Sequence, residues 1–292
     1  MALTLAESAK LSNDMVERGV IETILEESPV LQMLPFETVE GNSFKYNQEL
    51  SPGAAQFYAV NAIWTEGTAT FTQKTASLAI LGGDADVDNF IQRVRSNIQD
   101  QRAVQTAMKA KSVARAFEDS FIYGDTAADP NSFDGLFKTV AAGQKVAGDI
   151  TLAKLDQTID LILGGKPSLL LMSRRTRRRL KALLQASSHY VERGESSFGR
   201  QVMLYDGIPV EVSDFVVDTE TATAKTGGAL SSLWAIQFSA ADGVVGLQNG
   251  GVEVVDLGQL ESKDAQRVRI RWYVSIAVLR DSCIARLHSI TA

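Results

Sequence analysis

Residues 89–136 read NFIQRVRSNIQDQRAVQTAMKAKSVARAFEDSFIYGDTAADPNSFDGL, which predicts one very long helix followed by a turn-rich exit. Apolar side chains recur mostly every three to five positions, with charged and amide side chains between them. These positions are Phe90, Val94, Ile98, Val104, Met108, Val113, Phe117 and Phe121. A helix over residues 89–123, at about 1.5 Å per residue, is about 50 Å long. That exceeds the average globular helix and suits an extended subunit that packs sideways against others.

The acidic run before this helix consists of Asp84, Asp86 and Asp88. Asp88 is a good N-cap, and the cluster complements the positive end of the helix dipole. An EF-hand would need glycine where Asn89 stands and a bidentate glutamate where Arg95 stands. The run therefore predicts a helix start and no calcium loop. At the other end, Gly124 stops the helix.

Composition and charge set the broad class. The chain has 292 residues, 45% hydrophobic and 22% charged, so it can bury a real core. Its net charge of −6 argues against a dedicated nucleic-acid binder. The single cysteine, Cys283, reads as a small buried strand residue. Neither a signal pattern nor an apolar run of membrane-spanning length is present, which indicates a soluble protein made in the cytosol.

The N-terminal part changes from helical to alternating periodicity. Ser12 can cap a helix over residues 13–27, which Pro29 ends. Residues 36–83 alternate in polarity and predict strands, with Ile63 and Trp64 among them. Residues 53–67 are poor in large aliphatic side chains and predict a long projecting hairpin or loop. Such an arm cannot bury both of its faces on its own subunit.

The second half predicts an α/β region followed by long strands. Within residues 150–250 we expect a helix over 155–163, a strand over 168–172, a helix over 174–186 capped by Ser173, a strand over 207–212, a polar loop over 219–228 and a strand over 233–238. Residues 251–292 alternate strongly and predict two or more long strands. No internal repeat is present.

The sequence offers little for catalysis. His189 and His288 are the two histidines, and neither has a nucleophile or ordered partner nearby in sequence. The Gly-Gly-Lys at residues 164–166 lacks the spacing of a phosphate loop and reads as a helix stop. No cluster of His, Cys and carboxylates suggests a metal. We therefore expect no enzyme activity and no catalytic, cofactor-binding or metal-binding residues.

One basic cluster stands out, formed by Arg174, Arg175, Arg177, Arg178 and Arg179. Arginine binds phosphate well, so a nucleic-acid contact is one interpretation. A phosphate-binding surface usually spreads over a face, however, and the chain is acidic elsewhere. A solvated helix face or salt bridges to an acidic neighbouring subunit are the interpretations that the sequence favours.

Joined in order, these elements resemble the bacteriophage major capsid protein of the Hong Kong 97 type. The likeness covers nearly the whole chain. It is most specific in LTLAESAKLSNDMVERGVIETILEESPVLQMLPF, in AFEDSFIYGDTAADPNSFDGL, and in LLLMSRRTRRRLKALL followed by GIPVEVSD. These phrases have family character and contain no catalytic motif.

The resemblance implies an α+β fold of the Hong Kong 97 type. Its parts would be an N-terminal arm and helix over residues 1–35, an extended β-loop over 36–88, a peripheral domain with the spine helix over 89–140, an axial domain over 141–250, and return strands of the peripheral domain over 251–292. The extended loop would lie over an adjacent subunit. The last segment would complete the sheet of the peripheral domain.

The function implied is that of a major capsid subunit, a structural protein of the virion. Many copies would assemble in the host cytoplasm as pentamers and hexamers into an icosahedral head around double-stranded DNA, held by weak non-specific contact. Because no long scaffolding segment precedes the arm, we expect a separate scaffolding protein or a processed precursor, and also a portal. Some relatives crosslink through an arm lysine. Lys45 and Lys74 are available, but no crosslink is predicted.

Two alternatives remain open at this point. An encapsulin, a bacterial nanocompartment with the same fold and an enzyme cargo, would also have a short N-terminus. An α/β hydrolase or nucleotide enzyme would require a clustered polar site in a deep pocket.

Overall fold

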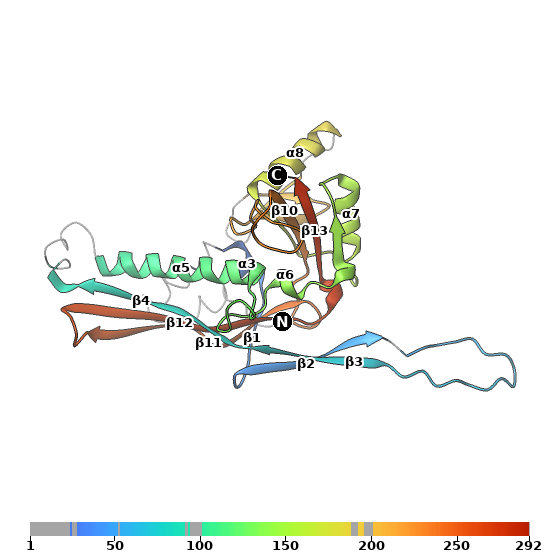
Figure 1. Ribbon diagram of the computed structural model, residues 1–292, viewed down its shortest axis with the longest axis horizontal. Coiled ribbons are helices and arrows are strands. Elements are labelled where there is room, and N and C mark those ends of the chain that lie inside the picture. The colour runs from blue at the N-terminus through green and yellow to red at the C-terminus, as the bar shows by residue number, and fades with distance from the viewer. Residues whose placement is uncertain are drawn as a thin grey trace.

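The computed structural model describes Ile24 and residues 28–51, 53–90, 93, 101–187, 192–195 and 201–291. Two sheets and a projecting hairpin dominate it (Figure 1). The four-stranded sheet has the order β1 (Phe36–Thr38), β11 (Val244–Gln259), β12 (Ala265–Val278), β4 (Ala79–Asp88). The seven-stranded sheet has the order β5 (Lys145–Ala147), β13 (Ile284–Thr291), β10 (Leu230–Ile236), β6 (Leu169–Met172), β9 (Ile208–Val212), β8 (Gln201–Tyr205), β7 (Glu192–Glu195). The hairpin pairs β2 (Ser43–Ser51) with β3 (Thr70–Ser77).

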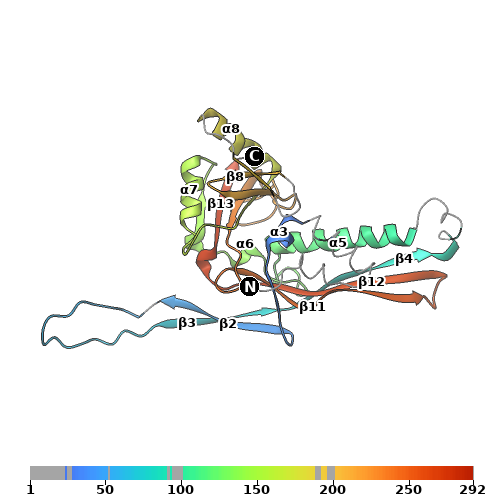
Figure 2. The same cartoon turned by 180° about the vertical axis from the view of Figure 1, so that it is seen from behind.

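The long helix is α5 (Gln101–Tyr123), 23 residues or about 34 Å. Asn89, Phe90 and Arg93 are also helical, while residues 91–92 and 94–100 of the predicted helix lie outside the described residues. The predicted end is confirmed, because the amide of Gly124 donates to the carbonyl of Ser120 at 2.8 Å directly after Tyr123. α5 lies along the four-stranded sheet in both views (Figures 1 and 2).

The main core lies between α5 and the two sheets. Phe117 of α5 packs against Trp272 of β12 with ring centroids 5.1 Å apart, and Phe36 of β1 packs on the same Trp272 ring at 5.5 Å. From the other sheet, Trp234 and Ile236 of β10 join this cluster. All of these side chains are nearly or fully buried.

Side chains of β10 point alternately to the two faces of the seven-stranded sheet, and the face that does not meet the α5 core packs against two helices. Leu233 and Ala235 of β10 alternate with Trp234 and Ile236, and they pack with a second cluster that contains Leu155 and Leu180. These leucines belong to α7 (Leu152–Asp160) and α8 (Arg174–Ala186). The seven-stranded sheet is therefore covered on one face by α7 and α8 and on the other by the α5 core.

Most elements expected in this region are confirmed. The Ser173 hydroxyl accepts the amide of Thr176 at 3.2 Å, which is the predicted cap, and α8 has the predicted bounds. The strands expected over 168–172, 207–212 and 233–238 are β6, β9 and β10, and the helix expected over 155–163 is α7, which begins three residues earlier. The helical turn α6 (Leu136–Thr139) follows the loop at residues 125–135.

The last segment divides between the sheets, which corrects one expectation. β11 and β12 pair with β4 and β1 in the four-stranded sheet, as expected for returning strands. β13 instead joins the seven-stranded sheet, antiparallel to β10 and parallel to β5. The reason is that the 3-10 turn η2 (Asp281–Cys283) redirects the chain after β12. Cys283 is buried as predicted, but it lies in this turn and not in a strand.

The N-terminal part is described only in pieces. Of the helix expected over residues 13–27, only Ile24 is described, and it is helical and buried. The short helix α3 (Pro29–Met33) follows, with the Ser28 hydroxyl accepting the Leu31 amide at 3.4 Å. Among the described residues, no helix is long and apolar enough to span a membrane.

Candidate assembly interface

The hairpin of β2 and β3 projects away from the body as an arm (Figures 1 and 2). Within the described part of the chain, its two strands pair only with each other, from Ser43 opposite Ser77 to Ser51 opposite Thr70. The arm points in the direction opposite to the end where α5 begins, so the molecule is long and thin. A projecting arm was expected from the sequence. The strands expected to include Ile63 and Trp64 are absent, because residues 53–69 are irregular.

The base of the arm is fixed to the body. Phe44, Tyr46 and Leu78 pack against a small cluster on the four-stranded sheet, formed by Val39, Val245, Leu247 and Ala277. The Asp281 carboxylate accepts from Gln48 at 2.9 Å and from Lys74 at 3.0 Å. The base thus has a core of its own, which the sequence did not reveal, whereas the outer part of the arm has none.

The tip of the arm comprises residues 53–69. Its conformation is stabilised by a close approach of the two chain segments at Gly53 and Gly67, called the neck below, and by a stacked pair of aromatic rings further out. A side chain on Gly53 would lie 2.7 Å from the carbonyl oxygen of Gly67, so only glycine fits where the two limbs meet. Further out, the Tyr58 and Trp64 rings stack at 4.3 Å. The Tyr58 hydroxyl accepts the Thr65 amide at 3.0 Å and donates to the Thr65 carbonyl at 3.1 Å.

This tip presents large apolar side chains to solvent. The most exposed side chains are Phe57 at 109%, Val60 at 93%, Ile63 at 92% and Trp64 at 78%. Contiguous exposed apolar surface of this kind usually marks a contact with another molecule. Burying one such side chain contributes about 1.5–3 kcal/mol. A molecule that covered the tip would therefore gain several kcal/mol of binding free energy.

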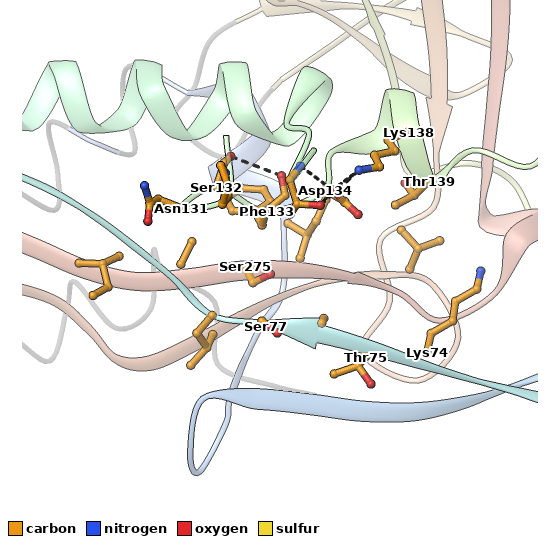
Figure 3. Close-up of a pocket in the computed structure, with 18 of the residues that line it drawn as sticks. Lys74, Thr75, Ser77, Asn131, Ser132, Phe133, Asp134, Lys138, Thr139 and Ser275 are labelled. Atoms are coloured by element: carbon orange, nitrogen blue, oxygen red, sulfur yellow. Dashed lines mark hydrogen bonds and ion pairs between the residues drawn. The ribbon is translucent and has the colours of Figure 1, made fainter. Parts of the chain in front are cut away.

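A cavity of about 890 Å³ opens beside the base of the arm (Figure 3). It lies between β3, the loop at residues 126–134, and β12, and polar side chains such as Thr75, Asn131 and Ser275 line it. The cation of Lys138 already pairs with Asp134 at 3.0 Å. Among the described residues, the lining contains no histidine or cysteine.

A buried ionic network joins the end of α5 to the seven-stranded sheet. Arg286 of β13 pairs with Glu220 at 2.9 Å, and both side chains are 1% exposed. The Glu220 carboxylate also accepts from Tyr123 of α5 and Ser232 of β10. Burial and the adjacent carboxylate raise the pKa of Tyr123 well above its usual range, so its phenol stays protonated. The network fixes the orientation of the sheet relative to α5.

The acidic run is the clearest correction to the sequence interpretation. Asp84 and Asp86 lie on β4 and pair across the strands with Arg269 and Arg267 of β12, both at 2.7 Å or less. Asp84 and Asp86 therefore form cross-strand ion pairs within a sheet and do not cap the helix. Only Asp88 acts as predicted, since it accepts the Phe90 amide at 2.8 Å.

The basic cluster occupies the exposed side of α8. Arg174 pairs with Asp214 at 2.7 Å, and Arg179 pairs with Asp149 at 2.6 Å. Arg175, Arg177 and Arg178 are exposed and make no ion pair with any residue in the described ranges. The two pairs already use the nearby carboxylates, which leaves a positive surface.

The remaining residues that the sequence singled out are the two histidines, Cys283 and Lys166. His288 lies on β13, half-buried, where burial and the charges of Arg286 and Lys145 lower its pKa; His189 lies outside the described residues. Burial raises the pKa of Cys283 to about 12. Lys166 pairs with Asp206 at 2.7 Å. Within the described part of the chain, no group of three or more His, Cys, Asp and Glu could hold a metal.

A two-sheet body with a long helix along one sheet and a preformed apolar arm defines a class of protein, the shell-building subunit. Residues 11–287 match the phage capsid family, and the chain belongs to that family. Its fold is that of a phage major capsid protein, a structural protein that builds the icosahedral shell of a bacteriophage head. No curated protein matches the sequence.

Solved structures share this fold at low identity. The SrpI encapsulin complex from Synechococcus elongatus PCC 7942 has a TM-score of 0.71 at 20% identity, over 100% of this chain and 97% of that chain. The capsid of a native GTA particle has a TM-score of 0.62 at 16% identity, over 91% of both chains. Microbacterium phage Oxtober96 has a TM-score of 0.65 at 14% identity, again over 91% of both chains.

Sequence reasoning missed the buried network and the shape of the tip. Arg286 stands in an apolar alternating run, so an inward-pointing charge could have been suspected there, but its partner Glu220 lies in a polar loop with no distinguishing pattern. The tip could have been suspected from Gly53, Tyr58, Trp64 and Gly67, since paired glycines and aromatics flank it on both sides.

Proposed function

We propose that this chain is a non-enzymatic head subunit that assembles as pentamers and hexamers in the host cytoplasm into a shell around phage double-stranded DNA. A separate scaffolding protein and a portal complete the particle. The observation that carries the proposal is the arm tip, which is preformed and apolar, yet its large apolar side chains are exposed among the described residues. A second copy is the natural cover for it, since a symmetric shell supplies one neighbour for every arm.

The division into parts belongs to the same proposal. Residues 1–35 form an N-terminal arm, 36–88 the extended loop, 89–140 the peripheral part with its spine helix, and 141–250 the axial part. The strands after residue 250 return to the peripheral part, except for β13. The sheet orders support the distinction between axial and peripheral parts, because β5 to β10 share one sheet while β11 and β12 share the other. Within residues 36–88, the hairpin of β2 and β3 projects, whereas β1 and β4 belong to the same sheet as β11 and β12.

A deletion within the tip tests the proposal. Because Gly53 and Gly67 meet at the neck, removal of residues 54–66 leaves a Gly-Gly turn that can close the hairpin. We expect the shortened chain to fold with unchanged circular dichroism and to form no closed shells by electron microscopy. The matched control is A59S/A62S, which keeps the loop length and the apolar anchors. Normal shells from the shortened chain would contradict the role of the arm.

An encapsulin-type compartment is the second candidate, and one observation favours it. The SrpI encapsulin has the higher TM-score of the structures compared above and is covered over almost its full length. The two functions differ in what the shell encloses. Particles isolated from the native host would contain duplex DNA if the chain forms a phage head, and protein cargo without DNA if it forms a nanocompartment.

A further inference from the structure

The exposed side of α8 concentrates positive charge that no ion pair within the described ranges compensates. Arg175, Arg177, Arg178 and Lys181 are all exposed, and none of them forms an ion pair within the described ranges. These four residues are called the α8 basic face below. The whole chain, by contrast, carries a net charge of −6. A concentrated positive face on an acidic protein requires an explanation.

Helix stability does not explain this face. The α8 basic face begins in the first turn of the helix, directly after the cap residue Ser173, and that turn contains no acidic residue. Positive charges at a helix N-terminus oppose the helix dipole and typically cost a few tenths of a kcal/mol each. Arg175 and Arg177 in the first turn therefore weaken the helix slightly, so helix stability gives no reason for their charge.

A protein partner fits this face poorly. Interfaces between proteins have a core of aromatic or aliphatic anchors from which charged residues are depleted. The other exposed side chains of α8 are Arg174, Ala182, Gln185 and Ala186, and none of the large exposed apolar residues lies on this helix. A partner recognised by charge alone fits better.

The spacing fits the phosphates of a nucleic acid. Arg175 to Lys181 spans about 9 Å of helix axis, and duplex DNA presents a phosphate about every 3.4 Å of axis on each strand. Arginine is well suited to such contacts because its guanidinium remains charged and binds phosphate oxygens in pairs. Contacts to phosphates alone carry no sequence information.

We propose that the α8 basic face binds the phosphate backbone of nucleic acid without regard to sequence. This inference rests on the proposed function as a shell around DNA and identifies the part of the wall that touches it. One small cationic face on an otherwise acidic subunit permits weak, salt-sensitive contact and leaves the rest of the wall repulsive. A long polyanion can then be held at many points without being fixed at any of them.

Binding of a fluorescent 30-base-pair duplex to the purified full-length chain, between 25 and 200 mM salt, tests the proposal. The variant R175Q/R178Q removes two contacts, so we expect binding weakened on the order of 10-fold at 0.1 M salt and a log–log salt slope shallower by about 2. The control K145Q/K166Q removes the same amount of positive charge from two exposed positions outside α8. Lys166 precedes the start of β6, whereas α8 begins after the end of that strand. We expect the control to keep the wild-type slope.

Three results would overturn the proposal: equal weakening in both variants, no binding by the wild-type chain, or unchanged binding by an R175Q/R178Q variant that no longer forms shells. The last result would make α8 a contact between subunits. Electron microscopy of the wild-type chain separates this inference from the proposed function. Closed shells with no dependence of DNA binding on α8 would refute only the inference, while absence of shells even when the scaffolding protein is present would refute the function.

Discussion

Arg286 of β13 donates to the Glu220 carboxylate across 2.9 Å in a place that water does not reach, since both side chains are 1% exposed. The Arg286 guanidinium also lies 4.2 Å from the ring centroid of Phe137 and 5.3 Å from that of Trp234. Tyr123 brings the end of α5 into the same network through its bond to Glu220. The ion pair and the Tyr123 bond therefore tie the end of the long helix to β13 of the seven-stranded sheet.

Breaking this pair should destabilise the subunit strongly. Arg286→Met leaves Glu220 as an uncompensated buried charge, and we expect a loss of about 3–5 kcal/mol in the free energy of unfolding. Urea denaturation of the unassembled chain measures it. The double variant R286M/E220Q should recover part of the loss, because it removes both charges. The exposed pair of Arg271 and Glu253 is the control, and R271Q should cost less than about 1 kcal/mol. Similar losses for the two single variants would contradict the special role of burial.

Two tryptophans should behave in opposite ways. Trp272→Ala empties the centre of the core between Phe36 and Phe117, so we expect a loss of about 3–5 kcal/mol. Trp64→Ala removes an exposed ring at the arm tip, so the unassembled chain should change in stability by less than about 0.5 kcal/mol. Thermal melts of dilute subunits and particle yields should separate these effects: W272A fails in folding, and W64A fails in assembly.

Cys283 should be inert in the folded chain. Burial raises its pKa to about 12, so the thiol carries its proton at neutral pH, and the side chain is closed to solvent. We expect reaction with an aromatic disulfide reagent to be at least 100-fold slower in buffer than in 6 M guanidinium chloride, measured by absorbance. Rapid modification of native subunits would show that η2 opens readily.

Acid should weaken the four-stranded sheet through its cross-strand pairs. The bond from Arg269 holds the pKa of Asp84 below its ordinary value of 3.8, and the bonds from Arg267 and Lys263 do the same for Asp86. Because these pKa values are lower in the folded state, the stabilisation is present above about pH 4 and is lost as pH falls towards the folded values.

The variant D84N/D86N tests this pH dependence. Its urea midpoint should be lower than that of the wild type at pH 7, and it should fall less between pH 5 and pH 2.5. A variant whose midpoint falls as steeply as that of the wild type would assign the acid sensitivity to other carboxylates.

Local signals predicted much of the fold. The Ser173 cap and the alternation of residues 168–172 depend on near neighbours in the chain, so the bounds of α8 and the position of β6 followed from the sequence. The projecting arm was also predicted, because residues 53–67 are poor in large aliphatic side chains. The exposed apolar surface that Phe57, Val60, Ile63 and Trp64 give its tip was not predicted. The resemblance of whole phrases then pointed to the capsid fold.

The errors concern pairings between distant residues. Asp84 and Asp86 read as helix caps because a helix follows, yet their partners lie more than 180 residues further along on β12. Nothing near them in sequence distinguishes a cap from a strand rung. The same holds for β13, whose alternation fits either sheet. Only the turn at residues 281–283 decides which sheet it joins.

The position of β13 has a consequence for the timing of folding. Translation delivers the chain from its N-terminus, but β13 lies between β5 and β10 in its sheet, and β11 and β12 are the two inner strands of the other. Neither sheet has all of its strands until the ribosome has made residues 244–291. The subunit can therefore complete both sheets only after almost the whole chain has been synthesised.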